Sequence, residues 1–362
     1  MSRTILSPAF ALSAFLSACS SGQTFQPTTG SSGTTGGAGT TTGASLGTVS
    51  TVVSFLQNES CSGAPASLAI DFSGDLLTVA GMMLLSVQPD GGITEVLPFQ
   101  LGVTAVAASS AGTYLTEGMP VALYTEQSFN QTFLSGGSTV CLDGSAGEDG
   151  GIGFASGRAI AADAEANVYL ADWSQTEAGC TRIRRVDFEG NSTTIAGTGA
   201  PGYMNGPGST AQFFEPSGVA VDRLRNVYVS DSFNNRIRMV GPDGTTSTVA
   251  GNGTAAFDDG AGPPDTPTSA TFNLPTGIAV DSSGNIFVAD TNNNSIRMIT
   301  ADGGTTTLAG NGKAGLVNGT LGKGGTTEFS FPISVAVDSK DNVYVADYGN
   351  CAIRVITLPG SP

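Results

Sequence analysis

Histidine is absent from the 362-residue sequence. Its absence excludes His-ligated zinc, Ser–His–Asp and Cys–His catalysis, and an imidazole general base. Charged residues are scarce as well, at 12%, and 30 acidic residues against 14 basic ones give a net charge of −16. An acidic chain without a basic patch repels nucleic-acid phosphates, so we expect no nucleic-acid binding.

Long periodic apolar segments are few, whereas the sequence has 51 glycines and many short β-branched stretches. Residues 216–250 divide into four such stretches, which are separated by turn-forming residues at 222–226, 232–235 and 242–245. This pattern predicts a four-stranded antiparallel sheet. Such a small sheet cannot bury both faces alone, so it needs neighbours of its own kind.

The same unit recurs along the chain about every 59 residues, as four landmark aspartates show: Asp163, Asp222, Asp281 and Asp338. A fixed long period with one sheet per unit predicts a β-propeller. The clear units are residues 157–196, 216–250, 275–309 and 332–357, and two degenerate units are expected at 65–97 and 102–135. These units predict an all-β propeller of six four-stranded blades, with five or seven blades as alternatives.

The last unit has only three of its four strands. Residues 47–57 contain Val49-Ser50-Thr51-Val52, which is similar to the fourth strands around Thr248 and Thr307. We therefore expect the N-terminal strand to complete the last blade and to close the ring without an open sheet edge.

The repeated motifs resemble the NHL repeat. In one unit they are residues 218–222 (GVAVD), 226–231 (NVYVSD) and 235–238 (NRIR), and the resemblance covers residues 157–357. It implies a six-bladed propeller. Because similar NHL propellers mostly bind proteins or other macromolecules, it also implies a non-catalytic binding or scaffold module with an unidentified macromolecular partner.

The N-terminal segment resembles a bacterial lipoprotein signal. Residues 1–18 are mostly apolar, and Leu16-Ser17-Ala18-Cys19 is similar to a lipobox, in which the cysteine becomes the lipidated N-terminus. Residues 19–46 are rich in Ser, Gly and Thr and are expected to form a flexible tether before a propeller domain at 47–362. This reading implies a lipid-anchored protein of the bacterial cell envelope. It favours the outer membrane, with the propeller exposed to the periplasm or the cell surface.

The four other cysteines suggest disulfides in an exported protein. Propeller topology places all four on one face of the ring. From the blade order we predict the pairs Cys141–Cys180 and Cys61–Cys351, and the second of these would staple the ring closure.

Repeated charges have a structural and a functional interpretation. An aspartate ends each clear second strand and an arginine follows on the third, so we expect hydrogen bonds and ion pairs rather than a ring of calcium ligands. The non-repeated segment 143–149 could hold calcium through Asp143, Glu148 and Asp149, but it lacks the spacing of a calcium loop. We expect a solvated acidic loop there.

Glycine-rich loops at residues 196–216, 250–275 and 309–332 connect the blades, and we expect them to form the ligand face. No catalytic or cofactor-binding residue is predicted. Two other functions stay open: a calcium-dependent lactonase-like enzyme and a purely structural envelope protein. The candidate contact residues are Tyr203, Met204, Phe257, Asp258, Asp259, Lys313 and Lys323.

Overall fold

The fold is all β, in a computed structural model of the chain. The structure describes residues 47–57, 60–61, 63–81, 83–88, 91–98, 103–116, 121–124, 131–135, 141, 143–144, 154, 157–174, 179–260 and 269–358. Within these ranges no helix is long and apolar enough to cross a membrane. The signal peptide and the tether predicted before residue 47 lie outside them.

The described strands form four-stranded antiparallel sheets in the segments that the sequence predicts. The sheets of the two degenerate units contain β4 (Pro65–Ile70), β5 (Leu76–Ala80), β6 (Met83–Val87) and β7 (Ile93–Pro98), then β8 (Ala105–Ser109), β9 (Gly112–Thr116), β10 (Val121–Tyr124) and β11 (Gln131–Ser135). The next two contain β12 (Gly157–Ala162), β13 (Val168–Asp172), β14 (Thr181–Val186) and β15 (Ser192–Gly199), then β16 (Pro216–Val221), β17 (Val227–Asp231), β18 (Arg236–Val240) and β19 (Thr246–Ala250). The last two contain β20 (Pro275–Val280), β21 (Ile286–Asp290), β22 (Ser295–Ile299) and β23 (Thr305–Ala309), then β24 (Pro332–Val337), β25 (Val343–Asp347), β26 (Ala352–Thr357) and β1 (Thr48–Ser54).

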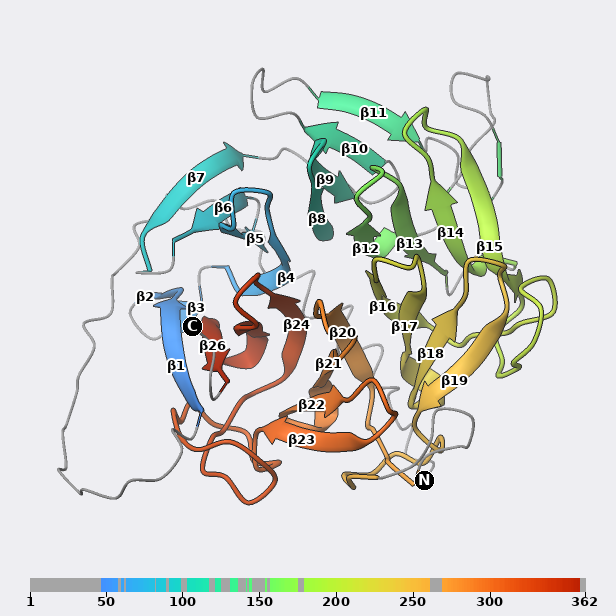
Figure 1. The fold of residues 1–362 in the computed structure, drawn as a ribbon. Coiled ribbons are helices and arrows are strands. Elements are labelled where there is room, and N and C mark those ends of the chain that lie inside the picture. The colour runs from blue at the N-terminus through green and yellow to red at the C-terminus, as the bar shows by residue number, and fades with distance from the viewer. Residues whose placement is uncertain are drawn as a thin grey trace, which may run out of the picture.

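The sheets are arranged radially around a centre, with the first strand of each sheet innermost (Figure 1). Each first strand contacts the first strands of two neighbouring sheets, in the cyclic order β4, β8, β12, β16, β20, β24 and back to β4. This arrangement is a β-propeller. Four of the first strands begin with a proline, a residue that is tolerated at the first position of a strand and at a sheet edge.

Sheet pairing defines two faces of the ring. We call the side where the first strands begin the entry face, and the second-to-third-strand turns lie there too. We call the opposite side the far face, and it carries the first-to-second and third-to-fourth turns. The pairs Val337↔Val343 and Val343↔Ile356 mark the far-face ends of β24, β25 and β26.

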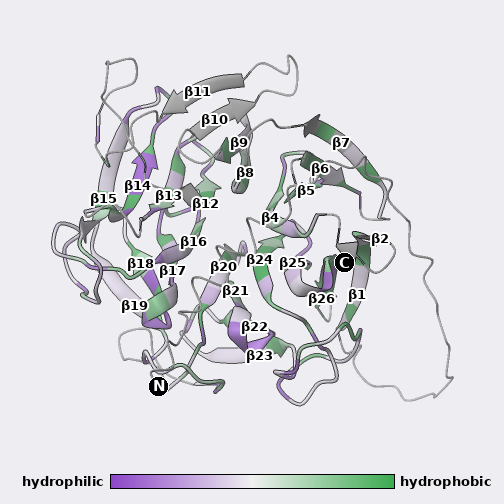
Figure 2. Cartoon of the chain, turned by 180° about the vertical axis from the view of Figure 1, so that it is seen from behind, coloured by the Kyte–Doolittle hydropathy of each residue, from purple (hydrophilic) through white to green (hydrophobic). Residues whose placement is uncertain are grey.

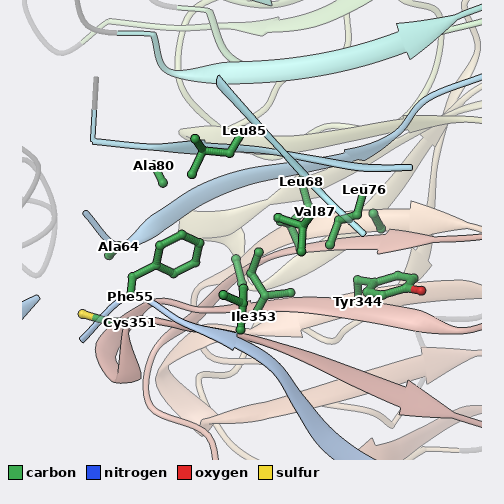
Figure 3. Packing of buried hydrophobic residues seen from close by; sticks show 13 residues of the cluster. Phe55, Ala64, Leu68, Leu76, Ala80, Leu85, Val87, Tyr344, Cys351 and Ile353 are labelled. Carbon is green, nitrogen blue, oxygen red and sulfur yellow. The ribbon is translucent and has the colours of Figure 1, made fainter. Parts of the chain in front are cut away.

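The N-terminal strand completes the last sheet, as the sequence predicts. β1 pairs with β26 in the order Val49↔Ile356 to Ser54↔Ala352, so the chain enters β1 from the far face. A short hairpin of β2 (Leu56–Gln57) and β3 (Ser60–Cys61) then leads toward β4. The closure has its own apolar core, in which Phe55 lies with Leu68 from β4 and Tyr344 and Ile353 from the last sheet (Figure 3).

Candidate functional site

Each clear repeat carries an arginine on its third strand that is buried although it is charged. The hydrophilic segments of β14, β18 and β22 stand out in Figure 2. All four arginines are fully buried, and each is paired with a fully buried aspartate at the end of the second strand. The pairs are Arg184–Asp172, Arg238–Asp231, Arg297–Asp290 and Arg354–Asp347.

Arg297 shows how such a charge is satisfied. Its Nη1 donates to Asp290 Oδ2 and to the Thr271 carbonyl, both at 2.8 Å. Its Nη2 donates to the Asp258 carbonyl and to Asp259 Oδ1, again at 2.8 Å. A buried guanidinium needs several partners of this kind to offset its lost hydration. The arginine therefore fastens the preceding loop to the sheet.

The paired aspartate also binds the turn that follows it. Asp290 accepts hydrogen bonds from the Asn273 N–H and from Asn293 Nδ2, both at 2.8 Å. Burial raises the pKa of Asp290 to about 6, although the charge of Arg297 and these hydrogen bonds act in the opposite direction. The same aspartate-to-asparagine bond recurs at Asp231 and Asp347. The structural role predicted for the repeated aspartates and arginines is confirmed.

The glycine-rich loops extend from the entry face to the far face, which the sequence does not predict. Gly206 pairs with Thr246 and Gly260 pairs with Thr305, at the far-face ends of β19 and β23. The loops therefore descend along the outer flank, where they fill the space beside the fourth strands, and return to the entry face. The expectation that they form one ligand face needs this correction, because hydrogen bonds to the buried arginines and the outer strands hold them down.

Several predicted contact residues serve this flank packing. The Tyr203 hydroxyl lies 2.9 Å from Thr248 Oγ1, and the Arg236 guanidinium stacks over its ring at 3.9 Å. Asp259 binds Thr307 as well as Arg297. The Arg297 guanidinium lies 5.3 Å from the ring centre of Phe257.

The remaining predicted contact residues are exposed. Met204 and Lys313 lie at the surface of their loops. Asp258 and Lys323 form an exposed ion pair at 3.4 Å, which links two neighbouring loops. An exposed pair of this kind contributes little to stability. These four residues are therefore available for contact, although they come from three different loops along the flank.

The cysteines follow the predicted topology where it is described. Cys141 and Cys180 form a disulfide with their Cα atoms 5.5 Å apart, so the first predicted pair is confirmed. Cys351 is also disulfide-bonded. The side chain of Cys61, its predicted partner, lies outside the described residues, as does Cys19, and that pairing stays a prediction.

The acidic segment contributes one structural contact. Asp143 lies 2.9 Å from Arg184 and takes the place that Asp259 has at Arg297. Glu148 and Asp149 lie outside the described residues. Among the residues that are described, no group of three or more His, Cys, Asp or Glu could hold a metal ion.

The sequence alone did not identify four apolar residues on the entry face. The rings of Phe214 and Phe233 pack in a tilted arrangement with their centres 5.2 Å apart, and Phe214 is 38% exposed. Leu274 and Phe331 lie immediately before the prolines that begin β20 and β24, and Phe331 is 49% exposed. We call these four residues the apolar rim, because they lie beside the inner strands of three successive sheets.

The rim residues have an unusual backbone. Leu274 and Phe331 have φ angles of 54° and 48°, in the left-handed region that favours glycine. Glu215 occupies the equivalent position with φ 50°. Asparagines of the preceding sheets hold the two apolar residues, since the Leu274 N–H donates to Asn235 Oδ1 and the Phe331 N–H to Asn294 Oδ1, both at 2.9 Å.

A weak sequence signal for the rim exists. The prolines that begin the first strands recur, whereas the residue before each proline changes from Glu215 to Leu274 to Phe331. Variation at a fixed position of a repeat marks a place where the units differ in their contacts. The exposure of the rim residues and their left-handed backbone could not be predicted from the sequence.

Comparisons with known proteins agree with this architecture. The sequence profile described as NHL repeat matches residues 272–297 and 329–356. NHL repeat-containing protein 2 of Bos taurus is 38% identical over 101 residues, which are 27% of this chain and only 13% of that protein. The fold and the repeats thus define a β-propeller of four-stranded repeat sheets. The NHL repeats that the sequence predicts are confirmed, and the chain is similar to NHL-repeat proteins over part of its length.

Solved structures share the fold at low sequence identity. An auxiliary nutrient binding protein from Bacteroides thetaiotaomicron is 16% identical with a TM-score of 0.63, over 86% of this chain and 76% of that one. A gluconolactonase from Xanthomonas campestris is 14% identical with a TM-score of 0.57, over 86% of this chain and 90% of that one. At these identities the likeness concerns the fold alone.

Proposed function

We propose that this chain is a six-bladed NHL propeller, tethered to the bacterial envelope through lipidated Cys19, that acts as a non-catalytic binding module. Its ligand is a protein segment that lies across the apolar rim on the entry face. The tether rests on the lipobox-like sequence, and a binding role is in keeping with the nutrient-binding protein of the same fold.

The left-handed backbone at Leu274 and Phe331 carries the proposal. A bulky residue in this region costs about 1 kcal/mol or more, and glycine would avoid that cost. Phe331 has this conformation and an aromatic ring that is half exposed, outside the buried core. Strained residues with exposed apolar side chains cluster at binding sites.

A protein segment suits the rim better than a small molecule. The rim extends from Phe214 and Phe233, past Leu274, to Phe331, and so spans three successive sheets. An extended segment can contact separate apolar anchors of this kind. Glu215 beside the rim and the net charge of −16 favour a segment that carries basic residues.

Selection from a displayed random-peptide library tests this proposal. Peptides selected on the native chain should lose binding to Phe214→Ser/Phe331→Ser, because both exposed anchors are removed. A matched control, Phe72→Ser/Leu224→Ser, removes two exposed apolar side chains from the far face and should leave binding intact. Equal binding to both variants would contradict the proposed rim site.

The lactonase alternative predicts a different result. A calcium-dependent lactonase should show a higher unfolding midpoint with calcium than with excess chelator, and should hydrolyse lactones. A binding module should show neither effect. Lactone hydrolysis that vanished with chelator would overturn the non-catalytic assignment.

A further inference from the structure

The far face carries the most exposed large apolar side chains among the residues that the structure describes. Phe72 is 82% exposed, Leu224 is 75% exposed and Phe188 is 60% exposed. Phe72 and Leu224 lie in first-to-second-strand turns, and Phe188 lies in a third-to-fourth-strand turn. All three therefore project from the same side of the ring, from the first, fourth and third sheets along the chain.

These side chains break the symmetry of the repeat. The turns that correspond to the one with Leu224 contain Ser282 and Ser283 in one sheet and Ser339 and Lys340 in another. The turn that corresponds to the one with Phe188 contains Ala301 and Asp302. Small or polar residues are thus sufficient for these turns, and the large apolar residues need another explanation.

The turns hold their tips rigidly. Asp222 Oδ1 accepts the N–H groups of Leu224 and Asn226, at 2.9 and 2.8 Å. Beside Phe72, Asp71 Oδ1 accepts the Asp75 N–H at 2.8 Å. Asp187 makes the same bond to Asn191 beside Phe188, also at 2.8 Å. Little conformational entropy would be lost if these tips entered an apolar phase.

The path of the chain points to the occupant of this face. β1 begins at Thr48, opposite Thr357 at the far-face end of β26, so the residues before β1 join the propeller on the far face. If Cys19 carries lipid, only residues 20–46 separate the bilayer from this face. A short tether keeps a tethered surface at an effective concentration on the order of millimolar, so weak insertion of a few side chains is sufficient.

We propose that the far face rests on the lipid bilayer, with Phe72, Phe188 and Leu224 inserted among the lipid headgroups. This inference rests on the proposed lipid anchor. Insertion is apolar rather than electrostatic, because basic residues of the face such as Arg223, Arg225 and Lys340 are offset by acidic ones such as Asp75, Glu189 and Asp341. The apolar rim then points away from the membrane, toward its partner.

Tryptophan substitution with quencher lipids tests the orientation. The full lipidated chain is placed in zwitterionic phosphatidylcholine vesicles that contain a brominated lipid, and Phe72→Trp, Phe188→Trp or Leu224→Trp supplies the signal. The native Trp173 is buried and gives a constant background. We expect the added emission at each far-face position to fall at least twofold, and the emission of the entry-face control Phe331→Trp to stay unchanged.

Failure of the anchor is recognised separately. A chain that does not float with vesicles lacks the proposed lipid, and that result counts against the tether. The face is then tested with residues 20–362 behind an N-terminal hexahistidine tag on nickel-chelating lipid, which keeps the same linker. Quenching at Phe331→Trp, or at none of the positions, would overturn the orientation. Self-association that is lost in Phe72→Ser/Leu224→Ser would also overturn it and assign the face to a second copy of the chain.

Discussion

The Thr51 hydroxyl lies 3.3 Å from Asn318 Oδ1, although 267 positions separate the two residues. Thr248 binds Asn205, and Thr307 binds Asp259, in the corresponding positions of two other sheets. The N-terminal strand therefore reproduces the side-chain contacts of a regular fourth strand as well as its backbone pairing.

Two truncations should distinguish the contribution of β1 to stability from that of the segment before it. A chain that begins at residue 47 should keep the unfolding midpoint of the longer chain. One that begins at residue 55 should unfold at a clearly lower temperature, because it loses buried Val49 and Val53 and opens a sheet edge. Thermal unfolding by circular dichroism measures both, and equal midpoints would show that β1 does not hold the ring.

Breaking a buried ion pair should cost more than breaking an exposed one. Arg297→Met leaves Asp290 buried without its partner, and we expect a loss of about 3–5 kcal/mol in the free energy of unfolding. Arg225 and Glu165 form an exposed pair at 3.8 Å, so Arg225→Ala should cost less than about 1 kcal/mol. Denaturant unfolding of the two variants measures the difference. Similar small losses would contradict the structural role of the arginine.

Three tyrosine side chains should ionise only at an unusually high pH. Burial and the neighbouring aspartates Asp163, Asp222 and Asp338 raise the pKa of Tyr169, Tyr228 and Tyr344 to about 12. Because the folded-state pKa is raised, the stability contribution of each group is complete below the unfolded-state value near 10 and is lost as the pH rises through about 12.

Absorbance at alkaline pH measures these groups. Phenolate formation should include a late step near pH 12, and Tyr228→Phe should reduce the amplitude of that step. A single step near pH 10 in the folded protein would contradict the hydrogen bonds to the aspartates.

Removal of the disulfide between Cys141 and Cys180 should lower the stability of the propeller. Cys141 and Cys180 are separated by 39 positions, and opening this loop should lower the free energy of unfolding by about 2–4 kcal/mol. Unfolding of Cys141→Ser/Cys180→Ser under oxidising conditions measures the loss.

Non-reducing peptide mapping of the native chain should also join Cys61 to Cys351, and a peptide that joins Cys61 to Cys141 would contradict that pairing.

The repeated parts of the fold could be predicted from the sequence because each repeat is an independent example of the same contacts. Asp290 and Arg297 recur at fixed spacing, and Thr51 matches Thr248, so their roles followed from comparison within the chain. The route of the loops could not be predicted, because it depends on how Asp259 reaches an arginine 38 residues later.

The apolar rim and the exposed side chains of the far-face turns could not be predicted from the sequence, for a related reason. Phe331 and Phe213 both lie near a first-strand proline, yet Phe331 is exposed and Phe213 is fully buried. Phe213 recurs as Phe272 and Phe329, and all three are buried, whereas the position of Phe331 holds Glu215 and Leu274 in the other repeats. The recurrence marks the buried position, but nothing in the sequence marks Phe331 as exposed.

The affinity of a library-selected peptide for variants of the apolar rim shows whether the rim is the binding site. Isothermal titration should show Phe331→Ser binding the peptide at least tenfold more weakly than the native chain, which corresponds to about 1.4 kcal/mol. Met204→Ser, on the exposed flank, should bind with unchanged affinity. Unchanged binding to Phe331→Ser together with weakened binding to Met204→Ser would place the binding site on the glycine-rich loops instead of the rim.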